Sequence, residues 1–371
     1  MIEVIKTTDL DQSLKLHSKL LPPTLPFLNS TTTLEIPPKF GIVNSCNGLL
    51  CVCTCPDKNP IYVWNPITGE YILIPKDERS RYDPDSIVFG FGFSSKANQY
   101  GVVMAFDGVK VGGISKTILQ IWTLGSRKWR TLSESFRRED FGLKTTRIFQ
   151  QAPFRQSFCV LYLNGAVHWL ATSDSSLIYI CSFNFDQEKI IKLSLPESFN
   201  ESEENRAIGN MRFGVLRDCL YVSDVRSYAR FELWVLKDYN DDKFSWTKEV
   251  LIDNFSVDIW PRGLYRPIKY LDNGDLLMFH PSSALVCYNL KEKTFRYFKI
   301  GEVDSEFDMI PHIPSLIPMK DVINMEGSEV EILNMRDGGE CSPQNLKEYT
   351  ELALDEINED ALSAAFSKIM E

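Results

Sequence analysis

A pattern of apolar and aromatic positions repeats five times through the middle of the chain. Each copy has an apolar residue, an aromatic residue, a variable residue and another apolar residue, with polar Ser182 at the first position of the third copy. The aromatic residues, separated by 58, 61, 51 and 54 positions, are Trp64, Trp122, Phe183, Trp234 and Tyr288. A period of about 50 residues is typical of the blades of a β-propeller.

Each copy contains four short runs suited to β-strands, separated by turn residues. In the fourth copy we expect strands over 211–216, 219–225, 231–236 and 246–252, with a turn at Arg217-Asp218 between the first two. Asn-Gly is the preferred pair of a type I′ hairpin, because both residues tolerate positive φ. Three other copies carry this pair at the first turn, at Asn47-Gly48, Asn164-Gly165 and Asn273-Gly274.

These units predict an all-β protein, because a four-stranded sheet buries both faces only when neighbouring sheets cover it. Five units are evident. A sixth can be assembled from the two ends of the chain, with 31–36 as an outer strand and 312–319 as an inner strand. We therefore predict a six-bladed β-propeller with kelch-like, four-stranded blades, closed by its N- and C-terminal strands. A five-bladed ring is the alternative.

The chain changes character after Lys320. Residues 321–371 contain 13 acidic and three basic side chains, which accounts for the whole net charge of −10. The alternating residues 329–335 can add a strand to the closing blade, and Ser342-Pro343 is a helix-start signal. Apolar residues follow at helical spacing, namely Leu346, Tyr349, Ala353, Ile357, Ala361, Ala365 and Ile369. This acidic amphipathic helix either packs across the propeller or detaches to bind a groove on a partner.

Residues 1–320 are electrically balanced, with 37 acidic and 37 basic side chains. This balance argues against a nucleic-acid partner, which requires a net basic surface. No apolar run approaches the roughly 18 residues of a membrane span, and the opening residues lack the apolar segment of a signal peptide. The nine cysteines, an odd number, are then best explained as reduced thiols in a cytoplasmic or nuclear protein.

Three groups of residues have types that occur in metal, phosphate or catalytic sites. Cys51, Cys53 and Cys55 alternate along one strand, so their sulfurs point in parallel and not towards one metal ion; buried packing is the simpler interpretation. The run FGFGF at 89–93 lacks the third glycine and the following helix of a phosphate-binding loop. His168 and His280 occupy equivalent second strands, where a propeller enzyme could gather them, but no Ser-His-acid pattern accompanies them. We therefore predict no enzymatic activity, no metal and no cofactor.

Several stretches of the chain resemble the F-box-associated domain of plant F-box proteins. They are GIVNSCNGLLCV (41–52), YVWNPITGEYILIP (62–75), FGFGF (89–93), LYLNGAVHWLA (161–171), CSFNFDQEKI (181–190), FELWVLKDY (231–239) and LVCYNLKEKTF (285–295). The resemblance implies a propeller that presents a protein substrate, behind an N-terminal F-box that binds a Skp-type adaptor in a cullin ubiquitin ligase. Residues 1–30 are too few for a complete F-box, although Leu21-Pro22 resembles its opening motif. We divide the chain into an N-terminal extension (1–30), the propeller (31–320) and the acidic tail (321–371).

The longest loops are expected to connect one blade to the next, over 76–87, 134–157, 197–210 and 253–266. In a propeller such connections emerge on one face, opposite the tight Asn-Gly turns, and function concentrates in loops of this kind. Three of them combine arginine with aromatic residues, the types enriched at interaction hot spots. The predicted partner-binding residues are Arg79, Arg81, Tyr82, Arg137, Arg138, Phe141, Arg147, Phe149, Arg155, Trp260, Arg262, Tyr265 and Arg266. The loop at 197–210 is acidic instead.

The sequence therefore favours a protein-binding module that resembles the substrate-recognition part of an SCF-type E3 ubiquitin ligase. Skp-type and cullin partners are expected only if an F-box is supplied. Two alternatives remain open: an interaction scaffold that acts outside any ligase, and a propeller enzyme with an axial active site.

Overall fold

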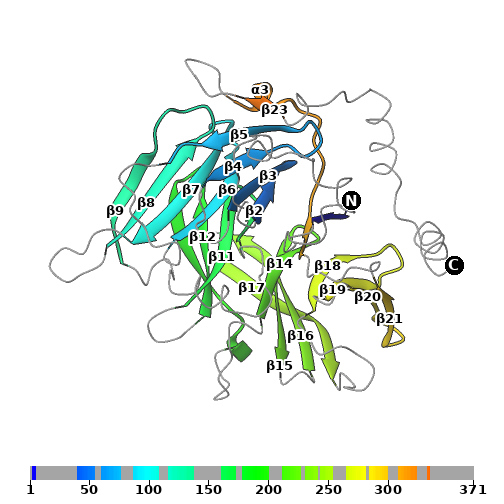
Figure 1. Cartoon of the computed structure of the whole chain (residues 1–371). Helices are drawn as coiled ribbons and strands as arrows, with labels where there is room; N and C mark the ends of the chain where they lie inside the picture. Colours follow the sequence, from blue (N-terminus) through cyan, green and yellow to red (C-terminus); the bar gives the residue numbers. More distant parts are fainter. Residues whose placement is uncertain are drawn as a thin grey trace, which may run out of the picture.

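The computed structural model describes residues 2–5, 40–54, 60–76, 87–107, 116–137, 160–172, 178–199, 211–226, 230–240, 243–253, 265–280, 284–299, 308–323 and 332–334. Their main feature is a series of five antiparallel sheets, each built from strands in sequence order (Figure 1). The sheets follow one another along the chain from β2–β5 to β18–β21 and form a five-bladed β-propeller. No helix in the described ranges is long and apolar enough to cross a membrane.

Each of the five blades contributes four strands to the propeller. Blade 1 consists of β2 (Phe40–Cys46), β3 (Leu49–Thr54), β4 (Ile61–Trp64) and β5 (Glu70–Ile74). Blade 2 consists of β6 (Ile87–Ser94), β7 (Gln99–Asp107), β8 (Lys116–Thr123) and β9 (Arg130–Arg137). Blade 3 consists of β10 (Val160–Leu163), β11 (Ala166–Thr172), β12 (Ile178–Asn184) and β13 (Lys189–Ser194).

The last two blades follow the same plan. Blade 4 consists of β14 (Met211–Leu216), β15 (Cys219–Arg226), β16 (Arg230–Asn240) and β17 (Lys243–Asp253). Blade 5 consists of β18 (Arg266–Tyr270), β19 (Leu276–His280), β20 (Ala284–Asn289) and β21 (Thr294–Lys299). The strands predicted for the fourth repeat are thereby confirmed. A 3₁₀ turn, η3 (Glu197–Phe199), follows blade 3.

The predicted sixth blade is wrong. The N-terminal strand β1 (Ile2–Ile5) pairs with β22 (Asp308–Pro311) as a separate two-stranded sheet, and residues 312–318 form no strand. Proline explains why, because it lacks the N–H that a sheet ladder needs, and Pro311, Pro314 and Pro318 punctuate this segment. The other predicted closing strand, 31–36, lies outside the described residues.

The segment after blade 5 returns to blade 1. It continues through the short helix α3 (Met319–Val322) to β23 (Leu333–Asn334), which pairs with β5 at the outer edge of blade 1. A strand does form within 329–335 as predicted, but it joins blade 1 and not an additional closing blade. The helix predicted from residue 343 lies outside the described residues.

The hydrophobic core lies between the blades, where the repeated aromatics are found. Phe183 and Trp122 are fully buried, Tyr288 and Trp64 are nearly so, and Trp234 is half-buried. The first strands of successive blades contact one another. Buried Asn44 of β2 reaches across to β6, donating to the Phe91 carbonyl at 2.7 Å and accepting from its amide at 2.9 Å. Its side chain thereby extends backbone-like pairing from blade 1 to blade 2.

Two of the three Asn-Gly turns have the predicted geometry. Positive φ occurs at both residues of Asn47-Gly48 and of Asn164-Gly165, as a type I′ turn requires. At Asn273-Gly274 only the glycine has positive φ, and the amide of Leu271 donates to the carbonyl of Asp275 around a wider loop. The prediction is therefore wrong for this third turn, where three residues and not two separate the paired backbone groups.

Candidate functional site

The order of strands separates two ends of every blade. Because each sheet is antiparallel and follows sequence order, the first-to-second and third-to-fourth connections leave one end, which we call the turn end. The second-to-third connections and the connections between blades leave the other, the loop end. The four long loops predicted from sequence each join the fourth strand of one blade to the first strand of the next.

Three of the predicted partner-binding residues fall within the described ranges. Arg137 is the last residue of β9, so the strand runs further into the 134–157 segment than expected. Arg266 is the first residue of β18 and is half-buried. The remaining ten lie outside the described residues: Arg79, Arg81, Tyr82, Arg138, Phe141, Arg147, Phe149, Arg155, Trp260 and Arg262.

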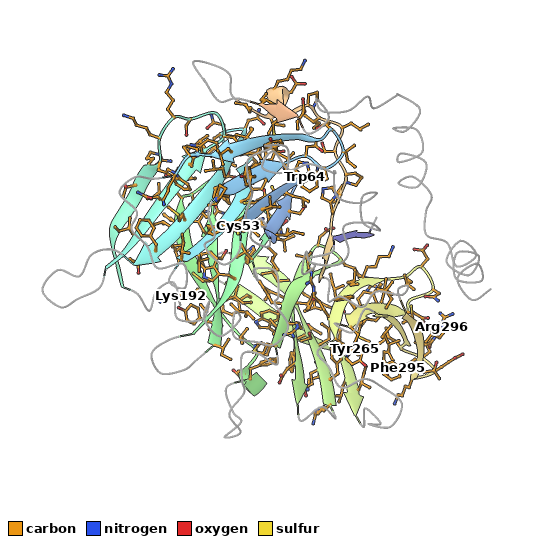
Figure 2. The ribbon with its side chains drawn as sticks, in the orientation of Figure 1. Cys53, Trp64, Lys192, Tyr265, Phe295 and Arg296 are labelled. Atoms are coloured by element: carbon orange, nitrogen blue, oxygen red, sulfur yellow. The ribbon has the colours of Figure 1, made fainter. Side chains whose placement is uncertain are left out.

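Tyr265 is a core residue in the structure. Its side chain is 2% exposed and packs among the apolar residues between blades 4 and 5 (Figure 2). Its ring centroid lies 4.8 Å from that of His280 in β19. This tyrosine immediately precedes the innermost strand of its blade, so it enters the core as that strand begins. The prediction that Tyr265 contacts a partner is corrected accordingly.

Buried charges gather in blade 4 towards the loop end. Asp224 and Glu232 are cross-strand neighbours on β15 and β16, and both are almost completely buried. Glu232 accepts from Arg230 at 2.8 Å, from Lys248 at 3.3 Å and from the indole N–H of Trp234 at 3.2 Å. Such partners offset the desolvation of a buried carboxylate. This cluster is not predictable from the alternating strand pattern, because that pattern alone assigns no partner to a charge.

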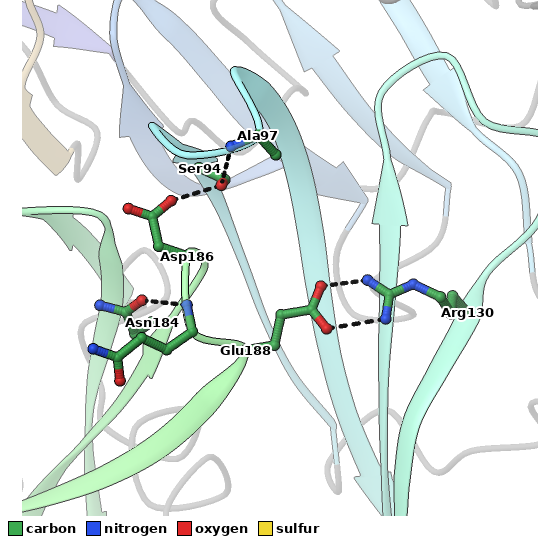
Figure 3. Close-up of polar contacts among 7 residues, drawn as sticks. Ser94, Ala97, Arg130, Asn184, Asp186 and Glu188 are labelled. Atoms are coloured by element: carbon green, nitrogen blue, oxygen red, sulfur yellow. Dashed lines mark hydrogen bonds and ion pairs between the residues drawn. The ribbon is translucent and has the colours of Figure 1, made fainter.

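At the turn end, polar contacts fasten blade 2 to blade 3. Asp186, between β12 and β13, accepts from the Ser94 hydroxyl at 2.6 Å (Figure 3). It also accepts from the Ser95 hydroxyl at 2.7 Å and from the Lys96 amide at 3.0 Å. These donors, led by the Ser94 hydroxyl, lower the pKa of Asp186 below its ordinary value. Beside it, Glu188 pairs with Arg130 through both carboxylate oxygens.

Indole hydrogen bonds tie the outer strands of two further blade pairs. Trp129, just before β9, donates to the carbonyl of Pro75 at 2.7 Å, just after β5. Trp246 in β17 donates to the carbonyl of Ser194 at 2.8 Å, at the end of β13. In both cases the beginning of one outer strand meets the end of the preceding outer strand. These two bonds therefore connect the outer strands of blades 1 and 2 and of blades 3 and 4.

The segment from His312 to Ile323, which we call the strap, crosses the turn end of blade 1. Asn65 donates to the carbonyls of Ser315 at 3.0 Å and Ile317 at 3.1 Å. At one end of the strap, the His312 ring lies 3.1 Å from the Gly48 carbonyl. At the other, the Met319 amide donates to Glu70 at 2.7 Å. The strap is therefore held by polar contacts with blade 1, although it follows blade 5 in sequence.

The residues considered for chemistry are placed in the core. His168 is fully buried, and this burial lowers its pKa to about 4, although a contact with the Leu163 carbonyl opposes the shift. It is therefore neutral at pH 7, far from the pKa that suits a general base there. Cys51 and Cys53 are buried free thiols in the core of blades 1 and 2, as the packing interpretation predicted, and Cys46 is buried in the same core. Cys55 lies outside the described residues. Within the described ranges, no three His, Cys, Asp or Glu residues form a metal-binding group.

Comparisons with known proteins agree with this architecture. Residues 2–319 match the family model described as the F-box associated beta propeller domain. F-box protein At3g07870 of Arabidopsis thaliana is 25% identical over 314 residues, covering 75% of this chain and 70% of the relative. F-box/kelch-repeat protein At3g23880 of the same plant is 24% identical over 284 residues, covering 76% and 70%.

A solved structure of an inactive virginiamycin B lyase from Staphylococcus aureus aligns at 11% identity over 70% of each chain. Its TM-score of 0.31 is too low to support an argument. The family match, in contrast, spans all five blades and both strands of the β1–β22 sheet. The chain therefore belongs to the family of F-box associated β-propeller domains.

Proposed function

We propose that this chain is a non-catalytic protein-binding module that presents a protein substrate to an SCF-type ubiquitin ligase. The observation that carries the proposal is the placement of all four blade-to-blade connections at the loop end. Three of these connections hold the arginine and aromatic residues identified from sequence. Membership of a family whose relatives are named F-box proteins supports the ligase part of the proposal.

The charge of the loops defines the kind of partner that this surface suits. Arg137 and Arg138 end the outer strand of blade 2 and begin its loop, while Glu197 begins the acidic connection after blade 3. A partner with acidic and aromatic groups would meet the arginine-bearing loops, because guanidinium groups pair with carboxylates and stack on rings. The acidic loop would exclude a partner that presents like charge there.

The cysteines support a proposed location. Cys46, Cys51, Cys53, Cys181, Cys219 and Cys287 are all free thiols. Free thiols are typical of a reducing compartment, so we propose a cytoplasmic or nuclear location.

The loop-end proposal predicts that charge reversal at Arg137 and Arg138 weakens partner capture without lowering the melting temperature. The tagged chain would be used for affinity capture from a native plant extract, with quantitative mass spectrometry of the captured proteins. We expect the double Arg→Glu variant to lose about tenfold of a specific partner, the scale of one or two hot-spot residues. The matched control reverses Arg127 and Lys128, which are exposed at the turn end of the same blade.

The captured proteins also separate the two binding hypotheses. When an F-box is supplied at the N-terminus of the tagged chain, co-capture of Skp and cullin subunits together with the specific partner is expected if the chain works within a ligase. A stable partner that is captured only without these subunits would favour the scaffold alternative. Equal loss with both charge reversals would contradict a specific loop-end site. A large fall in melting temperature for the Arg137 and Arg138 variant alone would make those residues structural.

A further inference from the structure

The strap holds three large apolar side chains in solvent. Ile313 is 79% exposed, Leu316 is 64% exposed and Ile317 is 51% exposed, and no other large apolar side chain in the described ranges is as exposed. They occur within five consecutive residues, between buried His312 and buried Met319. A cluster of this kind calls for an explanation, because scattered single hydrophobics are ordinary on protein surfaces but adjacent ones are not.

The backbone of the strap enforces this exposure. Asn65 binds the carbonyls of both Ser315 and Ile317, and the Ser315 hydroxyl accepts from the Ile317 amide at 3.2 Å. Ser315 packs so closely on Gly48 that a Cβ added there would lie 2.3 Å from the Ser315 Cβ. With residue 315 held inwards, the strap cannot turn its apolar neighbours towards the blade. The apolar surface is therefore preformed.

The chain that continues beyond the strap begins beside it. β23 pairs Asn334 with Glu70, and the same Glu70 carboxylate accepts from the amide of Met319. Asn334, the last described residue, therefore lies at the part of blade 1 that anchors the strap. Another 37 residues follow Asn334, and those from 343 to 371 carry seven acidic and two basic side chains around the apolar positions from Leu346 to Ile369.

We propose that residues 343–369 form an amphipathic helix whose apolar side covers Ile313, Leu316 and Ile317. The eight residues 335–342 can span about 26 Å when extended, which is ample within one blade. A helix of this length measures about 40 Å, so two or three of its turns cover the three strap residues. The acidic side then faces water, as expected for a helix docked on a surface. This intramolecular contact does not depend on the proposed ligase function.

The test is hydrogen–deuterium exchange of the full chain, measured in peptides from 343–369. Leu316→Asp places a charge in the apolar contact, so we expect exchange in these peptides to become about tenfold faster or more, as for an opened local contact. Leu251→Asp is the matched control, because Leu251 is 42% exposed on the outer strand of blade 4, away from the strap. The control should leave exchange in the tail unchanged.

The reciprocal variant keeps the proposal testable if Leu316→Asp fails to fold. Ile357→Asp leaves the strap intact and should increase hydroxyl-radical labelling of Leu316 several-fold without changing the melting temperature of the propeller. Tail peptides that exchange at the unprotected rate in the unaltered chain would overturn the proposal. Protection of the tail peptides that neither variant removes would also overturn it. So would protection that increases with protein concentration, which would indicate a second copy of the chain, or a change in exchange confined to peptides before residue 40.

Discussion

At the scale of single residues, several turn residues have a positive φ, a conformation that most side chains disfavour. Asn47, Gly48, Asn164 and Gly165 use the residue types that tolerate positive φ. The turn Arg217-Asp218 has φ of 50° and 57° without glycine or asparagine at its first position. The Arg217 guanidinium lies 3.9 Å above the Tyr270 ring of blade 5, and a cation–π contact of about 0.5–1 kcal/mol offsets part of that strain.

Replacing Gly165 by valine should damage folding. Its φ is +77°, and a β-branched side chain at positive φ is strongly disfavoured. We expect a loss of about 2 kcal/mol or more in the free energy of unfolding, measured by urea denaturation. Gly165→Asn is the control, since asparagine tolerates this conformation, and it should cost less than about 1 kcal/mol. An unchanged stability of the valine variant would refute the type I′ assignment.

At the scale of elements, neighbouring blades are held by side chains from connecting turns as well as by core packing. The contacts of Asp186 join the third-to-fourth turn of blade 3 to the first-to-second turn of blade 2. The indoles of Trp129 and Trp246 make equivalent bonds between outer strands. These bonds link different sheets, so separating blade 1 from blade 2, blade 2 from blade 3, or blade 3 from blade 4 breaks directional bonds as well as apolar contacts.

Asp186→Asn should lower stability in a pH-dependent way. The folded-state pKa of Asp186 is depressed, so its contribution is present above its unfolded pKa near 4 and is lost as the pH falls through the folded value. We expect a cost of about 1 kcal/mol at pH 7, discounted for solvent screening, that shrinks towards zero in acid. Denaturant midpoints from pH 7 to pH 3 would measure it.

Glu188→Gln provides the control for that experiment. Glu188 lies two residues away and forms an exposed ion pair with Arg130, for which a cost below about 0.5 kcal/mol is expected. A pH-independent deficit for Asp186→Asn would show that its role is geometric and not electrostatic.

Sequence patterns predicted the elements well because alternation and turn chemistry are local. The strands of blade 4 and the turn at Arg217-Asp218 were found from residues within a few positions of one another. The closure was missed because it depends on contacts such as Asn65 with Ser315, 250 residues apart, which no local pattern encodes. The prolines at 311, 314 and 318 were the available signal against an inner strand. Tyr265 was misplaced because a loop boundary alone does not reveal which side chain enters the core.

At the scale of the whole molecule, the propeller is closed by a segment that crosses blade 1 from its inner to its outer edge. β22 lies beside β2, the strap crosses the Gly48 turn, and β23 extends the sheet beyond β5. Met319 and Ile323 of this segment are buried in the core of blades 1 and 2. The end of the described chain therefore completes the hydrophobic core of its beginning.

Asn65→Asp should weaken the attachment of the strap to blade 1 without disturbing the turn that Asn65 stabilises. Aspartate keeps the side-chain oxygen that accepts from the amides of Ile67 and Thr68 but loses the amide group that donates to the strap. Two carbonyls lose their donor, so we expect a cost of about 1–3 kcal/mol, with faster hydrogen exchange in residues 312–323. Asn289→Asp is the matched control, because Asn289 makes the same turn bonds in blade 5 and no bond to the strap. Equal losses in both variants would contradict a closing role for Asn65.

The late position of Met319 and Ile323 has a consequence for synthesis. When all five blades have left the ribosome, the nascent chain still lacks Met319 and Ile323, which complete the core of blades 1 and 2. It also lacks Ser315, which packs on Gly48. Long-range contacts of this kind form late and leave apolar surface open to aggregation in the meantime. A product terminated before residue 308 would keep this apolar surface of blade 1 exposed permanently. Chaperones and proteases could then recognise a truncation at the C-terminal side through the exposed core of the first blade.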